Sequence, residues 1–343
     1  MSTNGVSIPA ARARAAQDFE RILTPGRRVA LTTHVNADGD GLGSEVALWH
    51  LLRARGLHPL ITNPTPIPER FSFLIPDGAD GSAHASKELE RADVVVVLDI
   101  ADLGRLGDLA QAVRSRGGAG TVPVACIDHH VSPGALPAGP RLVAPEATAT
   151  AELVFDLAGA LGWDLSPESA RALYVGLLTD TGGFRFANTT ARALKVAGAL
   201  LEHGVDPETI YELVYASAPE GRIRLMAEVL QTLVVEPEKG LAWVTVPPDA
   251  LERHGATADD LDGIVEFPRS IAGVRLALLF RPISGSRIKV SLRSMGNVDV
   301  AALAHQFGGG GHAKAAGASL AGTMAEVQAT VLAGARAALA NHS

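Results

Sequence analysis

The stretch Leu31–Ser44, LTTHVNADGDGLGS, is the part of the sequence around which the fold and the chemistry are organised. It continues an apolar run at 28–32 that is typical of a buried strand. His34, Asp38 and Asp40 follow this run, and one imidazole with two carboxylates suits a divalent cation. Glycines at 39, 41 and 43 allow the backbone to turn tightly and approach a ligand closely. The stretch therefore predicts a cation pocket on a loop after a strand.

Two later apolar strands also end in aspartate or histidine residues that could bind a metal ion. The segment 93–98 contains VVVVL, which is too apolar to face water on either side, and Asp99 follows it. A third strand at 122–127 runs into Asp128, His129 and His130. Ligands of parallel sheets bind at the carboxyl ends of the strands, so we expect these residues to meet at one edge.

Helical and strand patterns alternate through the first part of the chain, which predicts an α/β fold with a doubly wound parallel sheet. Helices are expected at 9–23, 45–55 and 105–115, with a further short strand at 60–62. The chain then becomes helical, at 149–161, 167–178 and 190–203. Asp180 lies between the last two of these helices, where it can reach the same edge of the sheet.

The chain is expected to hold two domains, at 1–217 and 241–343, joined by a connecting helix and linker at 218–240. Strand patterns at 241–246, 273–280 and 286–293 and helical patterns at 299–306 and 323–340 predict a smaller α/β second domain.

Six residues form the candidate metal-ligand set: His34, Asp38, Asp40, Asp99, His129 and Asp180. Six ligands suit two hard divalent ions such as manganese and are too many for one structural zinc. Each motif alone has a plainer explanation, such as a helix-capping aspartate or an ordinary polar loop. Their occurrence together at predicted strand and helix ends favours a two-metal site of the kind that promotes in-line attack on phosphorus.

Charge and composition narrow the classes of partner. The 343 residues carry 30 basic and 37 acidic side chains, a net charge of −7, which argues against a protein that tracks along long duplex nucleic acid. Between Pro268 and Gly317, however, seven basic residues accompany one acidic residue. The glycine run at 308–311, with His312 and Lys314 behind it, reads either as a flexible turn or as backbone amides and charges around a phosphate.

Cys126 is the only cysteine, so no internal disulfide forms, which fits a reducing cytoplasm. The N-terminal residues contain no apolar signal-peptide core, and no run is long enough to cross a membrane. Tyr211 and Tyr215, one helical turn apart, are interpreted as packing residues rather than base-stacking ones.

The four ligand motifs together resemble those of the DHH phosphoesterases. The motifs are the His34–Asp40 stretch, Asp99, Asp128-His129-His130 and the sequence TDTGGF that contains Asp180. Arg293-Ser294 with the glycine run and His312 resembles the accessory DHHA1 domain. In the size of the chain and the order of its motifs, the protein resembles the bacterial nano-RNase/pAp-phosphatase branch of this family. That branch is related to cyclic-di-AMP phosphodiesterases and RecJ. One departure is Ala37, where many relatives carry proline; we expect a slightly less rigid loop.

The resemblance implies a role for each residue. His34, Asp38 and Asp99 would hold one Mn²⁺, and Asp40, Asp99, His129 and Asp180 a second, with Asp99 bridging. Catalysis would involve Asp99, His130 facing the scissile phosphate, and Asp128 orienting a histidine. Across a cleft, the second domain would bind substrate through Arg293, Ser294, Gly309, Gly310, Gly311 and His312, and the first domain would add Arg185.

The resemblance also implies the substrates. These are short oligoribonucleotides cleaved to nucleoside monophosphates, 3′-phosphoadenosine 5′-phosphate (pAp), and cyclic or linear di-AMP. Relatives are often homodimers. The alternatives are a RecJ-like single-strand exonuclease, a manganese pyrophosphatase and, from a different class, a catalytically silent nucleotide sensor. Hydrolysis of a phosphodiester stimulated by manganese would separate an enzyme from a sensor.

Overall fold

The computed structural model describes residues 2–3, 5–118, 122–131, 134–283 and 286–340. The chain divides into two compact units, Met1–Ser217 and Ala218–Ser343, and each is described by itself. None of the helices in these described ranges combines the length and apolarity that crossing a membrane requires.

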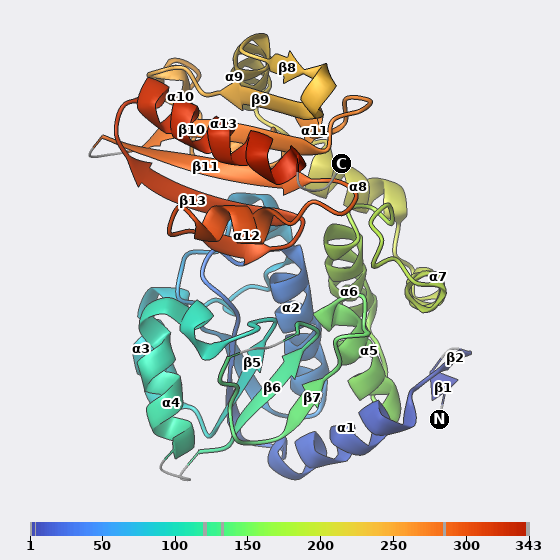
Figure 1. Ribbon diagram of the computed structural model, residues 1–343. Helices are drawn as coiled ribbons and strands as arrows, with labels where there is room; N and C mark the ends of the chain where they lie inside the picture. The colour runs from blue at the N-terminus through green and yellow to red at the C-terminus, as the bar shows by residue number, and fades with distance from the viewer. Residues whose placement is uncertain (1, 4, 119–121, 132–133, 284–285, 341–343) are drawn as a thin grey trace. The chain divides into compact units, whose positions relative to one another are not determined.

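The first unit is built on a parallel sheet in the strand order β4-β3-β5-β6-β7, which confirms the predicted doubly wound α/β class (Figure 1). Its strands are β3 (Arg28–Thr32), β4 (His58–Ile61), β5 (Val94–Leu98), β6 (Val124–Asp128) and β7 (Arg141–Val143), of which the last was not predicted. The order reverses between β3 and β5. Open parallel sheets bind ligands beyond the carboxyl ends of the strands at such a reversal.

Helices cover both faces of this sheet, and each face has its own apolar core. On one face lie α2 (Gly39–Ala54) and α5 (Thr150–Ala160), with α1 (Ala10–Ile22), α6 (Pro167–Asp180), α7 (Ala191–Glu202) and α8 (Pro207–Tyr215) packed around them. The other face carries α3 (Ala85–Arg91) and α4 (Ala110–Gly118). The strand β5 is fully buried because it lies between the two cores.

Helix α2 begins at Gly39 and not near residue 45, so the prediction that Asp40 lies on a loop is wrong. Asp38 caps the helix, because its Oδ1 accepts the backbone amides of Asp40 (3.0 Å) and Gly41 (3.1 Å). Gly43 serves helix packing: a Cβ there would lie 2.4 Å from the carbonyl oxygen of Ala172 in α6. Gly43 therefore lets the two helices approach closely, and Asp40 is held in the first helical turn.

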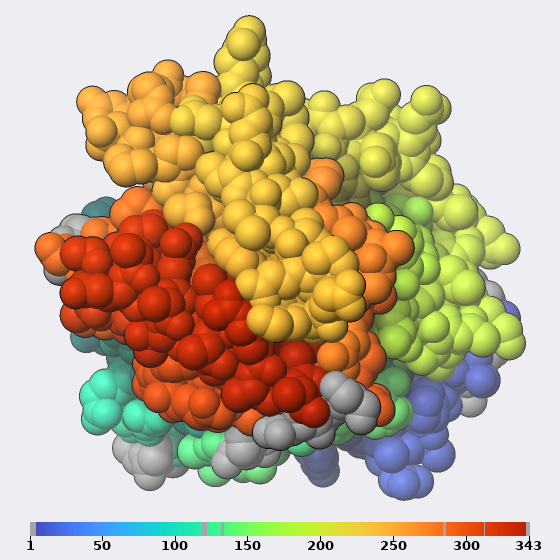
Figure 2. Space-filling view, turned by 45° about the horizontal axis from the view of Figure 1, so that its top comes forward, coloured from blue at the N-terminus to red at the C-terminus, as the bar shows by residue number. Residues whose placement is uncertain are grey.

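The second unit is a six-stranded mixed sheet in the order β12-β13-β11-β10-β9-β8, in which only β9 and β10 run parallel. The strands are β8 (Val234–Glu236), β9 (Leu241–Thr245), β10 (Leu276–Ile283), β11 (Arg287–Ser294), β12 (Gly310–His312) and β13 (Ala315–Ala321). Helices α12 (Val300–His305) and α13 (Met324–Ala340) pack on one face, and Figure 2 shows α13, in red, at the surface of this unit.

The other face of this sheet carries α9 (Glu220–Gln231), α10 (Ala250–Arg253) and α11 (Glu266–Arg269). Both α9 and β8 fall within the segment 218–240, where we expected a connecting helix and linker. They pack against β9 and so take part in the core of the second unit.

Candidate metal centre

The carboxyl ends of β3, β5 and β6 bring the candidate ligands together, as their positions in the sequence predict. Three groups of side chains have ligand atoms close enough to share an ion: His34 with Asp38 and Asp99, Asp40 with His129 and Asp180, and Asp99 with His129 and His130. Asp99 and His129 each belong to two groups. The arrangement thus offers adjoining positions for cations rather than isolated ones.

The rings of His34 and His129 are oriented in the same way. Nδ1 of His34 lies 2.9 Å from the carbonyl oxygen of Val35, and Nδ1 of His129 lies 3.3 Å from that of Ala147. A proton on Nδ1 satisfies each carbonyl and leaves the Nε2 lone pair for another partner. Both Nε2 atoms face carboxylates, which is the orientation that metal-ligating histidines adopt.

Asp99 occupies the centre of the cluster. Its Oδ2 lies 3.7 Å from Nε2 of His34, and its Oδ1 lies 3.6 Å from Nε2 of His129. The Thr150 hydroxyl donates a 3.0 Å hydrogen bond to Oδ1. The backbone of Asp99 is left-handed (φ 56°), a conformation that Asp tolerates better than most residues. This turn at the end of β5 presents one oxygen to each histidine.

The buried carboxylate of Asp40 is held by the first turn of α5. The backbone amides of Thr150 and Ala151 donate hydrogen bonds of 2.7 and 2.9 Å to its two oxygens. Helix N-termini favour anions because their first amide groups have no partner inside the helix. The sequence predicts the helix that begins at Thr150 but does not indicate the contact between Thr150 and Asp40.

Asp180, the last residue of α6, is oriented by Asn188, which sequence analysis also missed. The Asn188 side-chain amide donates to Oδ2 of Asp180 (3.1 Å) and to the carbonyl of Thr148 (3.2 Å). Oδ2 of Asp180 lies 3.8 Å from Nε2 of His129. Thr150 and Asn188 carry neither an imidazole nor a carboxylate, so the pattern of histidines and aspartates does not indicate them.

Asp128 holds His130 and the loop after β5 in one arrangement. Its Oδ1 lies 2.9 Å from Nδ1 of His130 and accepts the His130 backbone amide at 3.1 Å. Its Oδ2 accepts the amide of Ala101 at 2.7 Å. This geometry agrees with the orienting part expected of Asp128, whose catalytic role remains a prediction.

Burial and like charge make the cluster electrostatically demanding. Burial, together with the charges of Asp99, Asp180 and Asp38, raises the pKa of Asp40 well above its ordinary value. Burial also raises the pKa of Asp180, to about 6, against the opposing charge of His129. Burial lowers the pKa of His34, but its interactions with Asp38 and Asp99 outweigh that and raise it to about 10. Added positive charge stabilises the ionised form of several carboxylates buried close together, and divalent cations would supply that charge. The donor set therefore fits divalent cations.

A buried glutamate lies behind this cluster. Oε2 of Glu45 accepts a 2.8 Å hydrogen bond from the Asn63 side chain, whose Oδ1 accepts the Thr33 amide at 2.9 Å. Burial raises the pKa of Glu45 to about 8. Among the described residues, its Oε1 has no hydrogen-bond partner, which fits a protonated carboxyl group.

The residues expected to bind substrate lie in both units. Arg185, in the first unit, is exposed, and its Nε donates to the carbonyl of Gly182 at 2.6 Å. Arg293, at the end of β11, donates to Oε1 of Glu266 at 3.2 Å. Ser294 is buried, and its hydroxyl contacts the carbonyls of Val298 (2.7 Å) and Ala313 (3.2 Å). Ser294 therefore lies at the buried end of β11, and its contact with substrate remains a prediction.

The glycine run is a turn only in its first part: Gly308 lies in a turn, whereas Gly310 and Gly311 belong with His312 to the edge strand β12. A Cβ at Gly309 would lie 2.1 Å from the carbonyl oxygen of Gly317, so glycine allows the backbone to approach β13. The side chain of His312 lies outside the described part of the structure.

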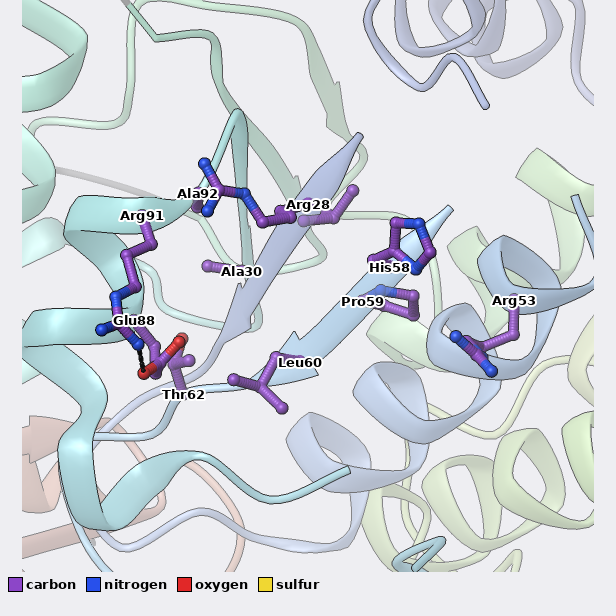
Figure 3. A pocket seen from close by; sticks show the side chains of 11 residues that line it. Arg28, Ala30, Arg53, His58, Pro59, Leu60, Thr62, Glu88, Arg91 and Ala92 are labelled. Carbon is purple, nitrogen blue, oxygen red and sulfur yellow. Dashed lines mark hydrogen bonds and ion pairs between the residues drawn. The ribbon is translucent and has the colours of Figure 1, made fainter. Parts of the chain in front are cut away.

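A surface pocket of about 230 Å³ lies elsewhere in the first unit, beside the edge strand β4 (Figure 3). Arg28, Arg53, His58 and Arg91 are among its lining residues, and Arg91 is paired with Glu88. None of the candidate metal ligands lines it. The chemistry of the cluster therefore belongs to the sheet edge and not to this pocket.

Comparison with known proteins supports the resemblance to the DHH phosphoesterases. Residues 28–177 match the DHH family, N-terminal domain, and residues 240–341 match the DHHA1 domain. The proteins named bifunctional oligoribonuclease and PAP phosphatase NrnA from Thermus thermophilus and Bacillus subtilis are 34% and 31% identical to this chain. The first alignment covers 86% of this chain and 84% of that protein, and the second 85% and 89%.

Solved structures show the fold. The exopolyphosphatase-related protein from Bacteroides fragilis superposes with a TM-score of 0.86 at 30% identity over 96% of both chains. The structure of RecJ with Mn²⁺ from Thermus thermophilus has a TM-score of 0.58 at 17% identity, covering 98% of this chain and 56% of that one. The two matching domain models and the sequence relatives establish that the chain belongs to the DHH family and carries a DHHA1 domain.

Proposed function

We propose that the chain is a metal-dependent phosphoesterase that hydrolyses short oligoribonucleotides to nucleoside monophosphates and removes phosphate from pAp. The observation that carries the proposal is the set of three overlapping ligand groups, joined through Asp99 and His129, at the edge where the strand order reverses. The names of the relatives from T. thermophilus and B. subtilis support the two substrates.

In this proposal, two divalent cations occupy the cluster, with manganese as the first choice. His34, Asp38 and Asp99 hold one, and Asp40, Asp99, His129 and Asp180 hold the other. When bound, the ions supply Lewis acidity toward phosphoryl oxygens and lower the pKa of water. Thr150 and Asn188 keep the carboxylates in place, since partners behind metal ligands fix their orientation.

His130 acts on the substrate phosphate. Burial lowers the pKa of His130, but its hydrogen bond to Asp128 and the charge of Asp99 outweigh this effect and raise the pKa. A protonated imidazole, held at Nδ1 by Asp128, presents an N–H at Nε2 that stabilises negative charge developing on a phosphate oxygen. Arg293 and Arg185 bind substrate phosphate, and two copies of the chain form a dimer.

The test is turnover on a matched panel of pAp, a diribonucleotide, linear and cyclic di-AMP, and a twenty-nucleotide single-stranded DNA. Each is measured in EDTA, in Mn²⁺ and in Mg²⁺. Fast hydrolysis of the short substrates in metal, with none in EDTA and little on the twenty-mer, is expected. Fast degradation of the twenty-mer would favour a RecJ-like exonuclease, and metal binding without any turnover would favour a nucleotide sensor.

A further inference from the structure

An exposed group of aromatic and basic side chains lies next to Asp180 in the first unit. Phe186, Tyr211 and Tyr215 are 48%, 58% and 42% exposed, and Arg70 and Arg185 are exposed as well. We call these five residues the aromatic–arginine surface. The interpretation of Tyr211 as a packing residue is wrong, because more than half of it faces solvent.

Direct contacts connect the two tyrosines to the end of α6. Tyr211 and Tyr215 lie one turn apart on α8, with ring centroids 5.4 Å from each other. The Tyr215 hydroxyl donates to the carbonyl of Leu178, in the last turn of α6, at 3.3 Å. Asp180 ends the same helix. The two rings are therefore anchored beside a candidate metal ligand.

Phe186 and the two arginines extend this group. The Phe186 ring lies against the α-carbon of Gly182, because a Cβ there would be 2.4 Å from its Cζ. The segment Glu69–Leu74, which carries Arg70, packs against α8, and the Arg70 guanidinium lies 4.8 Å from the ring centroid of Phe71. Burial raises the pKa of the Tyr215 hydroxyl, and the positive charges of Arg185 and Arg70 oppose this shift. The segment Glu69–Leu74, the loop after α6 and helix α8 thus contribute the rings and positive charges of this surface.

Aromatic rings interspersed with arginines are suited to single-stranded nucleic acid. Bases stack on exposed rings whatever their sequence, at about 1–3 kcal/mol per base, and guanidinium groups pair with the phosphates between them. Unpaired RNA bases are recognised mainly by such stacking. A phosphate substrate with a single base can use such a surface much less than an oligonucleotide can.

We propose that the aromatic–arginine surface is a stacking subsite for short single-stranded oligoribonucleotides, binding bases beyond the nucleotide at the metal centre. The inference rests on the proposed function, because it assigns this surface to the same substrates. With this subsite, the affinity for oligoribonucleotides rises with their length over the first few nucleotides, whereas pAp binds without this contribution.

The first test compares Tyr211→Ala with Tyr211→Trp, which keeps a ring, and with Leu194→Ala, which removes another exposed apolar side chain of this unit. KM is measured for pAp and for oligoribonucleotides of two to five residues. Tyr211→Ala should raise KM for the longer oligonucleotides roughly 5- to 150-fold, the equivalent of one lost stack, and leave the KM for pAp unchanged. Tyr211→Trp and Leu194→Ala should resemble the parent chain. An equal effect on pAp, or no effect at any length, would overturn the proposal.

A binding measurement separates this inference from the proposed function. Fluorescence anisotropy with a labelled tetraribonucleotide is recorded in EDTA, where no turnover occurs, for the same variants. Weaker binding by Tyr211→Ala alone supports the subsite, even if the parent chain hydrolyses nothing and the proposed function fails. If Tyr211→Ala instead converts a dimer to a monomer, with tetranucleotide binding intact, the surface is an interface between copies and the subsite is rejected.

Discussion

The backbone amide of Thr150 donates a 2.7 Å hydrogen bond to the carboxylate of Asp40, although 110 positions separate them in the chain. The same residue's hydroxyl reaches Asp99 at 3.0 Å. One residue at the start of α5 thus contacts two carboxylates, one from the first turn of α2 and one from the end of β5. The candidate metal centre depends on the position of this helix as much as on the ligands themselves.

Replacing Thr150 by valine removes the hydroxyl bond to Asp99 but keeps the branched shape and the backbone amide that Asp40 uses. Partners of metal ligands commonly contribute about 10- to 100-fold to metal affinity or activity. We expect Thr150→Val to weaken Mn²⁺ binding by this order in a calorimetric titration, and Thr150→Ser to restore most of it. Equal affinity of the two variants for Mn²⁺ would show that the Thr150 hydroxyl does not contribute to metal binding.

Asp99→Asn should abolish turnover while leaving the fold intact, because both histidines face this carboxylate. A metal ion supplies several kcal/mol of charge stabilisation, so the loss should be on the order of a thousandfold or more. The measurement is hydrolysis of a diribonucleotide in Mn²⁺, with circular dichroism to monitor folding. Asp77→Asn, at an exposed aspartate of the same unit, is the control and should retain full activity.

Asn188→Ala should loosen Asp180 without removing a ligand. The Asn188 amide joins Asp180 to the carbonyl of Thr148, so its loss frees the carboxylate to move. We expect one metal equivalent to bind about tenfold more weakly while the other keeps its affinity. A titration followed by Mn²⁺ electron paramagnetic resonance separates the two. A uniform loss at both sites would contradict the assignment of Asp180 to a single ion.

Glu45 should make the metal-free protein less stable as the pH rises. Its folded pKa of about 8 lies above the ordinary value of 4.5, so the folded state binds more protons between these limits. The free energy of unfolding therefore falls from about pH 4.5 to pH 8, by up to a few kcal/mol.

Glu45→Gln keeps a side-chain oxygen for Asn63 and removes this titration. Thermal unfolding in EDTA at pH 5, 6.5 and 8 tests the effect. The variant should lose stability less steeply over this range than the parent chain, and at pH 8 it should be the more stable of the two. Parallel curves would mean that Glu45 titrates normally.

The sequence alone was enough to predict the parallel sheet and to identify the residues that meet at its edge. Buried parallel strands are apolar throughout, so the segments before His34, Asp99 and Asp128 are recognisable, and parallel strands deliver their ends to one place. Ligand residue types directly after such strands are a local signal. The start of α2 was placed too late because its glycines indicate a turn unless the packing partner, α6, is known.

Only the tertiary structure decided what lies behind and beside the ligands. The hydrogen bonds from Thr150 to Asp40 and from Asn188 to the carbonyl of Thr148 join segments 110 and 40 positions apart, and threonine and asparagine occur in too many settings to indicate such a role in advance. The exposure of Tyr211 likewise depends on which face of α8 packs against its neighbours. The sequence gives the residue types, and their spacing determines which of them share a helix face. Burial and long-range hydrogen bonds arise only when separate elements pack together.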